Sequence, residues 1–271
     1  MVGCSTRHST PADGEIHVWT ARVIDDDCLT DGLRELLDTK ERVRAARFAQ
    51  PRHRMSFIQF RAFARQVLGG CLGVPAAEVT FANGRHGKPQ LVRGAGRPEI
   101  HFNLSHSRDY CVLAARLGCA VGIDLEQVRD MPGSLDIARR HFTRAEAEQL
   151  ARLDGDARRD AFFALWTHKE AAVKTLGASL AENFERFEFA LDPPGQPRLV
   201  SFDATQPTPD GLWLRRLDAP PGYVAALASL RPCAKIVSRA WNVVAHDAYA
   251  APHWPAASVR SRETSDHPRG A

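Results

Sequence analysis

The sequence predicts an α+β protein made of two halves, each containing helices and a small antiparallel sheet. Helical patterns over residues 30–70 precede strand-like runs over residues 98–126. The order then repeats, because helical patterns over residues 143–177 precede strand-like runs over residues 187–230. A chain of 271 residues can bury a sizeable core in one large or two small domains. We place the division between the halves near Gly118.

In the first half, alternating apolar and polar side chains over residues 15–22 predict a strand. Pro51 then separates two amphipathic stretches that predict helices. Two apolar runs at residues 110–116 and 120–126, joined through Leu-Gly-Cys, predict a hairpin. The polar residues 103–107 are expected to form a short loop between strands.

In the second half, Thr143 and Glu146 form a capping box that predicts the start of a helix. The next helix is expected over residues 157–177 and ends at Gly177, a residue typical of helix C-termini. Strands are expected at residues 187–191, 198–202, 212–217 and 223–230.

The composition excludes several classes of protein. The 36 basic and 32 acidic residues give a net charge of +4, which is too small to indicate a nucleic-acid-binding protein. The sequence has no apolar run of about 18 residues and no N-terminal secretory signal, so we expect a cytoplasmic protein without membrane contact. The six cysteines lack the spacings of zinc sites, which argues against structural zinc.

Two carboxylates lie close together in the segment Val-Gly-Ile-Asp-Leu-Glu. Asp124 and Glu126 are two residues apart on a predicted strand, so they point to the same face. Neighbouring carboxylates repel each other unless a cation lies between them, and their oxygen atoms suit Mg²⁺. The alternative is a solvated strand end that carries acidic residues by chance.

The helix expected over residues 157–177 carries a second reactive segment, Trp-Thr-His-Lys-Glu-Ala-Ala-Val-Lys. Trp166, Glu170 and Lys174 recur every four residues and form a row at the border of the apolar stripe. A carboxylate in this row is partly desolvated and still reachable. The alternative is a plain surface ion pair between Glu170 and Lys174, which have the favourable orientation for one.

Other polar and basic segments suit anions. The segment Phe-Asn-Leu-Ser-His-Ser groups donors for phosphate oxygens, with ordinary turn chemistry as the alternative. Lys88 has a defined position between a glycine and a proline, and Arg54, Arg61 and Arg65 recur along a helical stretch that is otherwise interpreted as a solvated face. The sequence contains no GxGxxG, GxxxxGK[ST] or HExxH motif, which excludes those nucleotide and zinc sites.

The order of the segments is more specific than any one of them. Four segments follow one another along the chain: Gly-Lys-Pro, Phe-Asn-Leu-Ser-His-Ser, Val-Gly-Ile-Asp-Leu-Glu and Trp-Thr-His-Lys-Glu-Ala-Ala-Val-Lys. This succession resembles the motifs of the 4'-phosphopantetheinyl transferase superfamily. The resemblance covers about residues 15–231, and the chain length points to the larger, monomeric type with two pseudo-symmetric α/β lobes. It implies transfer of the 4'-phosphopantetheine arm of coenzyme A to a carrier-protein serine, with Mg²⁺ and release of adenosine 3',5'-bisphosphate.

The resemblance also implies roles for individual residues. Asp124, Glu126 and Glu170 would hold Mg²⁺ against the diphosphate of coenzyme A, and Glu170 would also accept the proton of the serine. Lys174 would contact the diphosphate and stabilise the departing phosphate, and Lys169 is a further candidate for a phosphate contact.

Further contacts to coenzyme A are implied for the first half of the chain. Lys88 matches the lysine of the Gly-Lys-Pro motif, and Ser105 and His106 match the loop that contacts the phosphates. For the 3'-phosphate we choose Arg54, with Arg61 as the reserve.

The chain is thus expected to have four parts. Residues 1–14 would be a disordered N-terminus, residues 15–118 an N-terminal lobe that binds coenzyme A, and residues 119–231 a C-terminal lobe with the magnesium and catalytic motifs. Residues 232–271, rich in Pro, Ala, Ser, His and Arg, would be a low-complexity tail, mostly disordered or loosely docked.

The expected partner is an apo acyl or peptidyl carrier protein of polyketide, nonribosomal peptide or fatty acid synthesis. Its acidic helix would suit a mildly basic enzyme, docked between the lobes with hydrophobic residues from 130–142. One alternative is a magnesium-dependent phosphodiesterase or nuclease, although no lysine stands two residues after Glu126 as one class of nucleases requires. The other is a non-catalytic protein that binds coenzyme A or carrier protein, which would lack a metal ligand, and none is missing.

Overall fold

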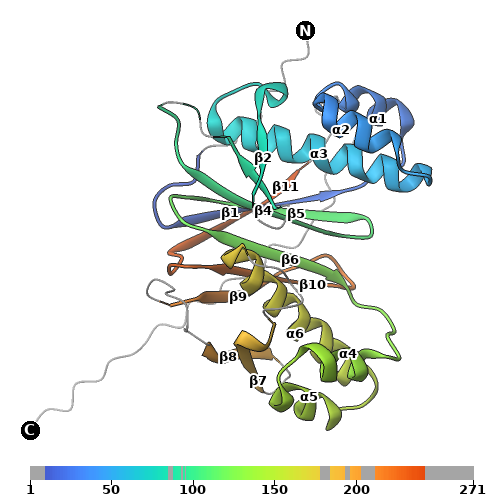
Figure 1. Cartoon of the computed structure of the whole chain (residues 1–271), viewed down its shortest axis with the longest axis vertical. Helices are drawn as coiled ribbons and strands as arrows, with labels where there is room; N and C mark the ends of the chain where they lie inside the picture. The colour runs from blue at the N-terminus through green and yellow to red at the C-terminus, as the bar shows by residue number, and fades with distance from the viewer. Residues whose placement is uncertain are drawn as a thin grey trace, which may run out of the picture.

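The computed structural model describes residues 10–84, 88–92, 94, 96–177, 184–192, 196–202 and 211–241. Its helices and small sheets form two lobes, one above the other in Figure 1. This arrangement confirms the predicted α+β class. Among the described residues, none of the helices combines the length and the apolar character that a membrane crossing needs.

The N-terminal lobe is built on a four-stranded sheet in the order β11-β1-β5-β4. Its strands are β1 (Glu15–Arg22), β4 (Ile100–Ser107), β5 (Tyr110–Leu117) and β11 (Lys235–Trp241). A hairpin of β2 (Phe81–Asn83) and β3 (Pro89–Leu91) lies beside the sheet. One face is covered by the helices α1 (Asp27–Arg34), α2 (Thr39–Ala46) and α3 (Pro51–Leu72) (Figure 1). The core between sheet and helices includes Trp19, Phe63 and Leu113, all fully buried.

The C-terminal lobe is built on a three-stranded antiparallel sheet in the order β6-β10-β9. Its strands are β6 (Val121–Gln127), β9 (Trp213–Leu217) and β10 (Tyr223–Ser229), with a separate hairpin of β7 (Phe187–Asp192) and β8 (Gln196–Phe202). Its helices are α4 (Ser134–His141), α5 (Arg144–Ala151) and α6 (Gly155–Leu176). The predicted capping box of Thr143 and Glu146 starts α5, and Gly177 ends α6 in the left-handed conformation at φ 65°.

Two local predictions were wrong. The runs at 110–116 and 120–126 do not form a hairpin, because β5 and β6 belong to different sheets and the chain passes from lobe to lobe between them. The polar residues 103–107 are not a loop either, since they lie in β4, which pairs with β5 along its whole length. Asn and Ser side chains suit this strand because they find partners across the division between the lobes.

The expected tail also needs correction at its start. Residues 235–241 form β11, which pairs in parallel with β1 over its whole length. Trp241 is buried and packs on Phe63, with ring centroids 5.1 Å apart. The buried Arg116 guanidinium donates to the carbonyl oxygens of Arg231 and Pro232 at 2.6 and 2.7 Å and so fixes the path into this strand. Residues 242–271 and 1–9 lie outside the described residues.

Candidate active site

Asp124 and Glu126 lie on β6, where this strand faces the N-terminal lobe. Asp124 is only 2% exposed, and its Oδ1 accepts hydrogen bonds from Ser105 Oγ at 2.7 Å and Lys174 Nζ at 2.6 Å. Its Oδ2 is also buried and has no hydrogen-bond partner in the described part of the chain. Glu126 Oε2 accepts from Ser107 Oγ at 2.9 Å. Both carboxylates are therefore held by hydroxyl groups of the other lobe.

Glu170 and Lys174 reach the same place from α6. The helix can approach β6 closely because of Gly122, where a Cβ atom would lie 2.1 Å from the carbonyl oxygen of Ala171. No real side chain tolerates such a distance, so only glycine allows this packing. The Lys174 ammonium thereby lies between Asp124 and Glu170, 2.6 Å from Asp124 Oδ1 and 3.0 Å from Glu170 Oε2.

The electrostatics of this cluster follow from its burial and its excess of acids. Burial and the nearby Asp124 raise the pKa of Glu170 to about 7, against the opposing effect of Lys174. Burial and Asp124 also raise the pKa of Glu126. Burial disfavours the charged form of Lys174, but Asp124 and Glu170 outweigh it and raise its pKa to about 12. Near neutral pH the site therefore holds a permanent cation beside a carboxyl group that can gain or lose a proton.

The cluster fits a divalent cation in its chemistry. Three carboxyl groups supply the hard oxygen donors that Mg²⁺ prefers, and Asp124 Oδ2 is a buried acceptor without a partner among the described residues. Three carboxyl groups share a single ammonium here, and burial together with the nearby Asp124 raises the pKa values of both Glu126 and Glu170. Within the described ranges, no three acidic, His or Cys side chains are already arranged as a metal cage, because Lys174 lies between two of the acids.

Lys88 is brought to the boundary between the lobes, but its ammonium group contacts the protein. Nζ donates to the carbonyl oxygen of Lys174 at 2.5 Å and to that of Val121 at 3.5 Å. Burial and the charge of Lys174 lower its pKa to about 8. Lys88 therefore caps the C-terminal end of α6, where a cation is favourable. Gly87 of the same motif lies outside the described residues.

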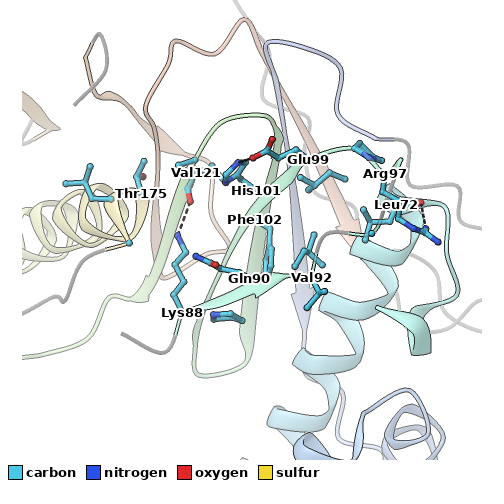
Figure 2. Close-up of a pocket in the computed structure, with 18 residues that line it drawn as sticks. Leu72, Lys88, Gln90, Val92, Arg97, Glu99, His101, Phe102, Val121 and Thr175 are labelled. Carbon is cyan, nitrogen blue, oxygen red and sulfur yellow. Dashed lines mark hydrogen bonds and ion pairs between the residues drawn. The ribbon is translucent and has the colours of Figure 1, made fainter. Parts of the chain in front are cut away.

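A cavity of about 410 Å³ opens beside Lys88 (Figure 2). Gln90 and His101 line it from the N-terminal lobe, and Val121 and Thr175 line it from the C-terminal lobe. The three carboxylates are not among its lining residues. Lys88 lines the cavity and also contacts the backbone of Lys174, whose ammonium lies between Asp124 and Glu170.

The candidate residues for phosphate binding on α3 and β4 have different surroundings. His106 stacks on Phe60 with ring centroids 5.3 Å apart, and burial and Lys174 lower its pKa. Arg61 is committed inside its own lobe, because its Nε donates to Glu41 at 2.5 Å. Arg54 is exposed on the first turn of α3 and is accessible from solvent.

Lys169 is not placed to contact phosphate, contrary to the prediction. Its side chain is fully buried, and Nζ lies 2.8 Å from Glu146 Oε2. Nζ also donates to the carbonyl oxygens of Phe184 and Phe187 at 2.7 and 2.5 Å. Position 169 faces the core of the C-terminal lobe, whereas its neighbour Glu170 faces β6.

One contributor was not assigned from the sequence. Ser107 holds Glu126 through its hydroxyl group and is itself buried. The signal was present, because Ser105 and Ser107 alternate along β4 as Asp124 and Glu126 alternate along β6. It became interpretable only when the two strands were known to face each other.

Comparisons with known proteins agree with this geometry. A family model described as the 4'-phosphopantetheinyl transferase superfamily matches residues 120–228, and a 4'-phosphopantetheinyl transferase N-terminal model matches residues 30–118. The chain is 35% identical over 179 residues to the 4'-phosphopantetheinyl transferase HetI of Nostoc sp., covering 66% of this chain and 75% of that protein. It is 30% identical over 168 residues to the 4'-phosphopantetheinyl transferase Sfp of Bacillus subtilis, covering 62% and 70%. The chain therefore belongs to the 4'-phosphopantetheinyl transferase superfamily.

Proposed function

We infer that this protein transfers the 4'-phosphopantetheine arm of coenzyme A to a serine of an apo carrier protein and releases adenosine 3',5'-bisphosphate. The observation that carries this conclusion is the cluster of Asp124, Glu126, Glu170 and Lys174, which elements far apart in the chain bring together in a member of this family. Buried acids beside a fixed ammonium suit phosphoryl transfer, which depends mainly on positioning and charge stabilisation.

We propose that Glu170 is the general base. Its carboxylate lies 3.0 Å from Lys174 Nζ at the boundary between the lobes, where it can take the proton of the carrier serine directly or through a water molecule. Lys174 stays protonated throughout, since its pKa is raised to about 12. Its ammonium can contact the diphosphate and stabilise negative charge on the leaving phosphate.

We propose Mg²⁺ as the cofactor, held by Asp124, Glu126 and Glu170. When bound, the ion would neutralise charge on the diphosphate oxygens and align the scissile bond. The convergence of three carboxyl groups supports this assignment, as does the buried Oδ2 of Asp124, which has no hydrogen-bond partner among the described residues. Ser105 and Ser107 would orient two of the three carboxylates.

For coenzyme A, we propose that His106 and the exposed Arg54 contact phosphate groups at the N-terminal lobe. The Ser105 hydroxyl group donates its one proton to Asp124 and accepts from Lys174 Nζ at 3.2 Å, so we propose that it orients Asp124 and does not itself donate to a phosphate. Lys88 would act indirectly by fixing the backbone of Lys174. We keep residues 15–118 and 119–231 as the proposed lobes for coenzyme A and for the metal and catalytic motifs.

We propose that the carrier protein docks beside α4, with its acidic helix near the exposed side chains of Arg139 and Arg140. Both lobes that build the site come from one chain, which supports a monomeric enzyme. We expect it to act in the cytoplasm, together with coenzyme A and its carrier.

The test is to incubate the protein with Mg²⁺, coenzyme A and apo carrier proteins of several types and to measure the intact mass of each carrier. We expect at least one carrier to gain the mass of one phosphopantetheine arm. Folded protein that modifies none of them would contradict the proposed function. In that event, cleavage of a phosphodiester substrate would favour the nuclease alternative, and binding of coenzyme A without transfer would favour a non-catalytic protein.

A further inference from the structure

The boundary between the lobes is a row of side-chain hydrogen bonds in place of a β-ladder. The strands β4 and β6 lie alongside each other but belong to different sheets. Three alternate side chains of β4 each accept a backbone N–H of β6. The pairs are Asn103 Oδ1 with Ile123 N at 2.8 Å, Ser105 Oγ with Leu125 N at 3.4 Å, and Ser107 Oγ with Gln127 N at 3.1 Å.

The two serines in this row make a second contact that the asparagine does not. Each hydroxyl group also donates to a carboxylate of β6, Ser105 to Asp124 at 2.7 Å and Ser107 to Glu126 at 2.9 Å. A hydroxyl group can accept and donate at the same time, which suits it to this double contact. Asn103 contacts only the backbone of Ile123 in this row.

Glu126 depends on this contact more than Asp124 does. Asp124 is nearly fully buried and is also held by Lys174. The Glu126 side chain is 25% exposed, and Arg129 Nη1 lies 3.8 Å from the same oxygen that Ser107 holds. The Arg129 side chain is 44% exposed, so we expect that without the Ser107 hydroxyl it would draw the carboxylate outward and away from Asp124.

We propose that Ser107 is a positioning residue that holds Glu126 for the divalent cation and ties the geometry of the metal site to the contact between the lobes. Its hydroxyl group is fixed by the N–H of Gln127, so the orientation of the carboxylate follows from the alignment of β4 with β6. This proposal rests on the function proposed above. A carboxylate pre-oriented by a buried partner binds metal more tightly, because hydrogen bonds to a ligand fix its orientation and their loss typically weakens binding about 10–100-fold.

The experiment measures Mn²⁺ binding by electron paramagnetic resonance, in the presence of coenzyme A and without carrier protein. Four variants are compared with the wild type: Ser107→Ala, Ser107→Thr, Ser107→Cys and Asn103→Ala. We expect Ser107→Ala to weaken Mn²⁺ binding roughly tenfold, the lower end of the effect of such orienting partners. Ser107→Thr keeps the hydroxyl and should restore most of the affinity, and Ser107→Cys, a weak donor of similar size, should lie between.

Asn103→Ala is the matched control, because it removes one hydrogen bond from the same row without touching a carboxylate. It should lower the melting temperature as Ser107→Ala does but leave the Mn²⁺ affinity of the folded protein within about twofold. The proposal is wrong if Ser107→Ala binds Mn²⁺ as tightly as Asn103→Ala. If Ser107→Ala does not fold, Ser107→Cys takes its place, and the proposal is wrong if that variant binds Mn²⁺ as tightly as Asn103→Ala.

The two proposals fail in distinguishable ways. If the wild type modifies a carrier but the Ser107 variants bind Mn²⁺ normally, only the positioning role is overturned. If the wild type modifies no carrier and binds no Mn²⁺ with coenzyme A, the proposed function fails and this inference fails with it.

Discussion

Two lysines on α6, only five residues apart, have opposite surroundings. Lys169 and its partner Glu146 are fully buried, and two backbone carbonyl groups complete the hydrogen bonds of the ammonium. Lys174 is 21% exposed and shares its ammonium between Asp124 and Glu170. The first pair joins α5, α6 and β7 inside the C-terminal lobe, whereas the second faces the N-terminal lobe.

This difference separates structural from chemical use of the same residue type. Burial lowers the pKa of Lys169 and raises that of Glu146, but each partner offsets the effect on the other and every polar atom is used internally. At Lys174 the acids outnumber the cation, and Asp124 keeps a buried oxygen without a partner in the described part of the chain. The cluster around Lys174 thus has excess negative charge and access from solvent, and these two properties make it the one of the two that is available to a ligand.

The largest expected effect concerns the buried pair. Lys169→Met should lower the free energy of unfolding by about 3–5 kcal/mol, because Glu146 is left buried without its cation. Urea denaturation measures this loss. The double variant Lys169→Met with Glu146→Leu should recover much of it, and the fraction that folds should retain near-normal turnover. A Lys169→Met protein that is stable but inactive would reverse the assignment of the two lysines.

The next effect is on catalysis. Glu170→Gln and Lys174→Met should each lower kcat by about 10²–10³, the usual loss when one group that stabilises the transition state is removed. Steady-state transfer to a carrier protein measures this, with melting temperature as the control for folding. Near-normal turnover of Glu170→Gln would exclude Glu170 from both the base and the metal roles.

Lys88 tests whether a third lysine acts on the site indirectly, because its ammonium contacts the backbone of Lys174. Lys88→Met should lower kcat about tenfold, as the loss of one charge-assisted hydrogen bond allows, with a smaller change in KM for coenzyme A. Lys40→Met, at an exposed lysine of α2, is the control and should change neither. A large rise in KM with unchanged kcat would instead indicate direct contact of Lys88 with coenzyme A.

The smallest effect is on stability as a function of pH. The folded-state pKa of Glu170 is raised from 4.5 to about 7, so the folded protein binds more protons than the unfolded chain between these values. Stability should therefore fall as pH rises through this window. Mg²⁺ binds the ionised carboxylates. The increase in melting temperature on adding Mg²⁺ should therefore become larger as the pH rises from 4.5 to about 7. Glu170→Gln should remove most of this growth, and an equal Mg²⁺ effect at all pH values would contradict the assignment.

Local patterns were sufficient to predict most elements of the fold. Alternation predicted β1, and the capping box and Gly177 predicted the start of α5 and the end of α6. Pairing between distant segments could not be predicted in this way. The strand β11 depends on contacts with β1, more than 200 residues earlier, and β5 and β6 were read as a hairpin because they are adjacent in sequence.

The same limit applies to the candidate site: local motifs were predictable, and contacts between distant segments were not. The order of motifs was enough to group Asp124, Glu126, Glu170 and Lys174, and the structure brings them together. The same motif contains Lys169, and nothing local distinguishes it from Lys174, because its partner Glu146 lies on another helix. The sequence grouped Ser107 with possible phosphate donors, and its contact with Glu126 was not predicted because that partner lies across the division between the lobes.

The most direct test of the account is anomalous diffraction from crystals of the protein with Mn²⁺ and coenzyme A. We expect one strong anomalous peak within bonding distance of carboxylate oxygens of Asp124, Glu126 and Glu170, beside the diphosphate of coenzyme A. Bound coenzyme A with its diphosphate remote from these three side chains, or an ion held by other residues, would contradict it.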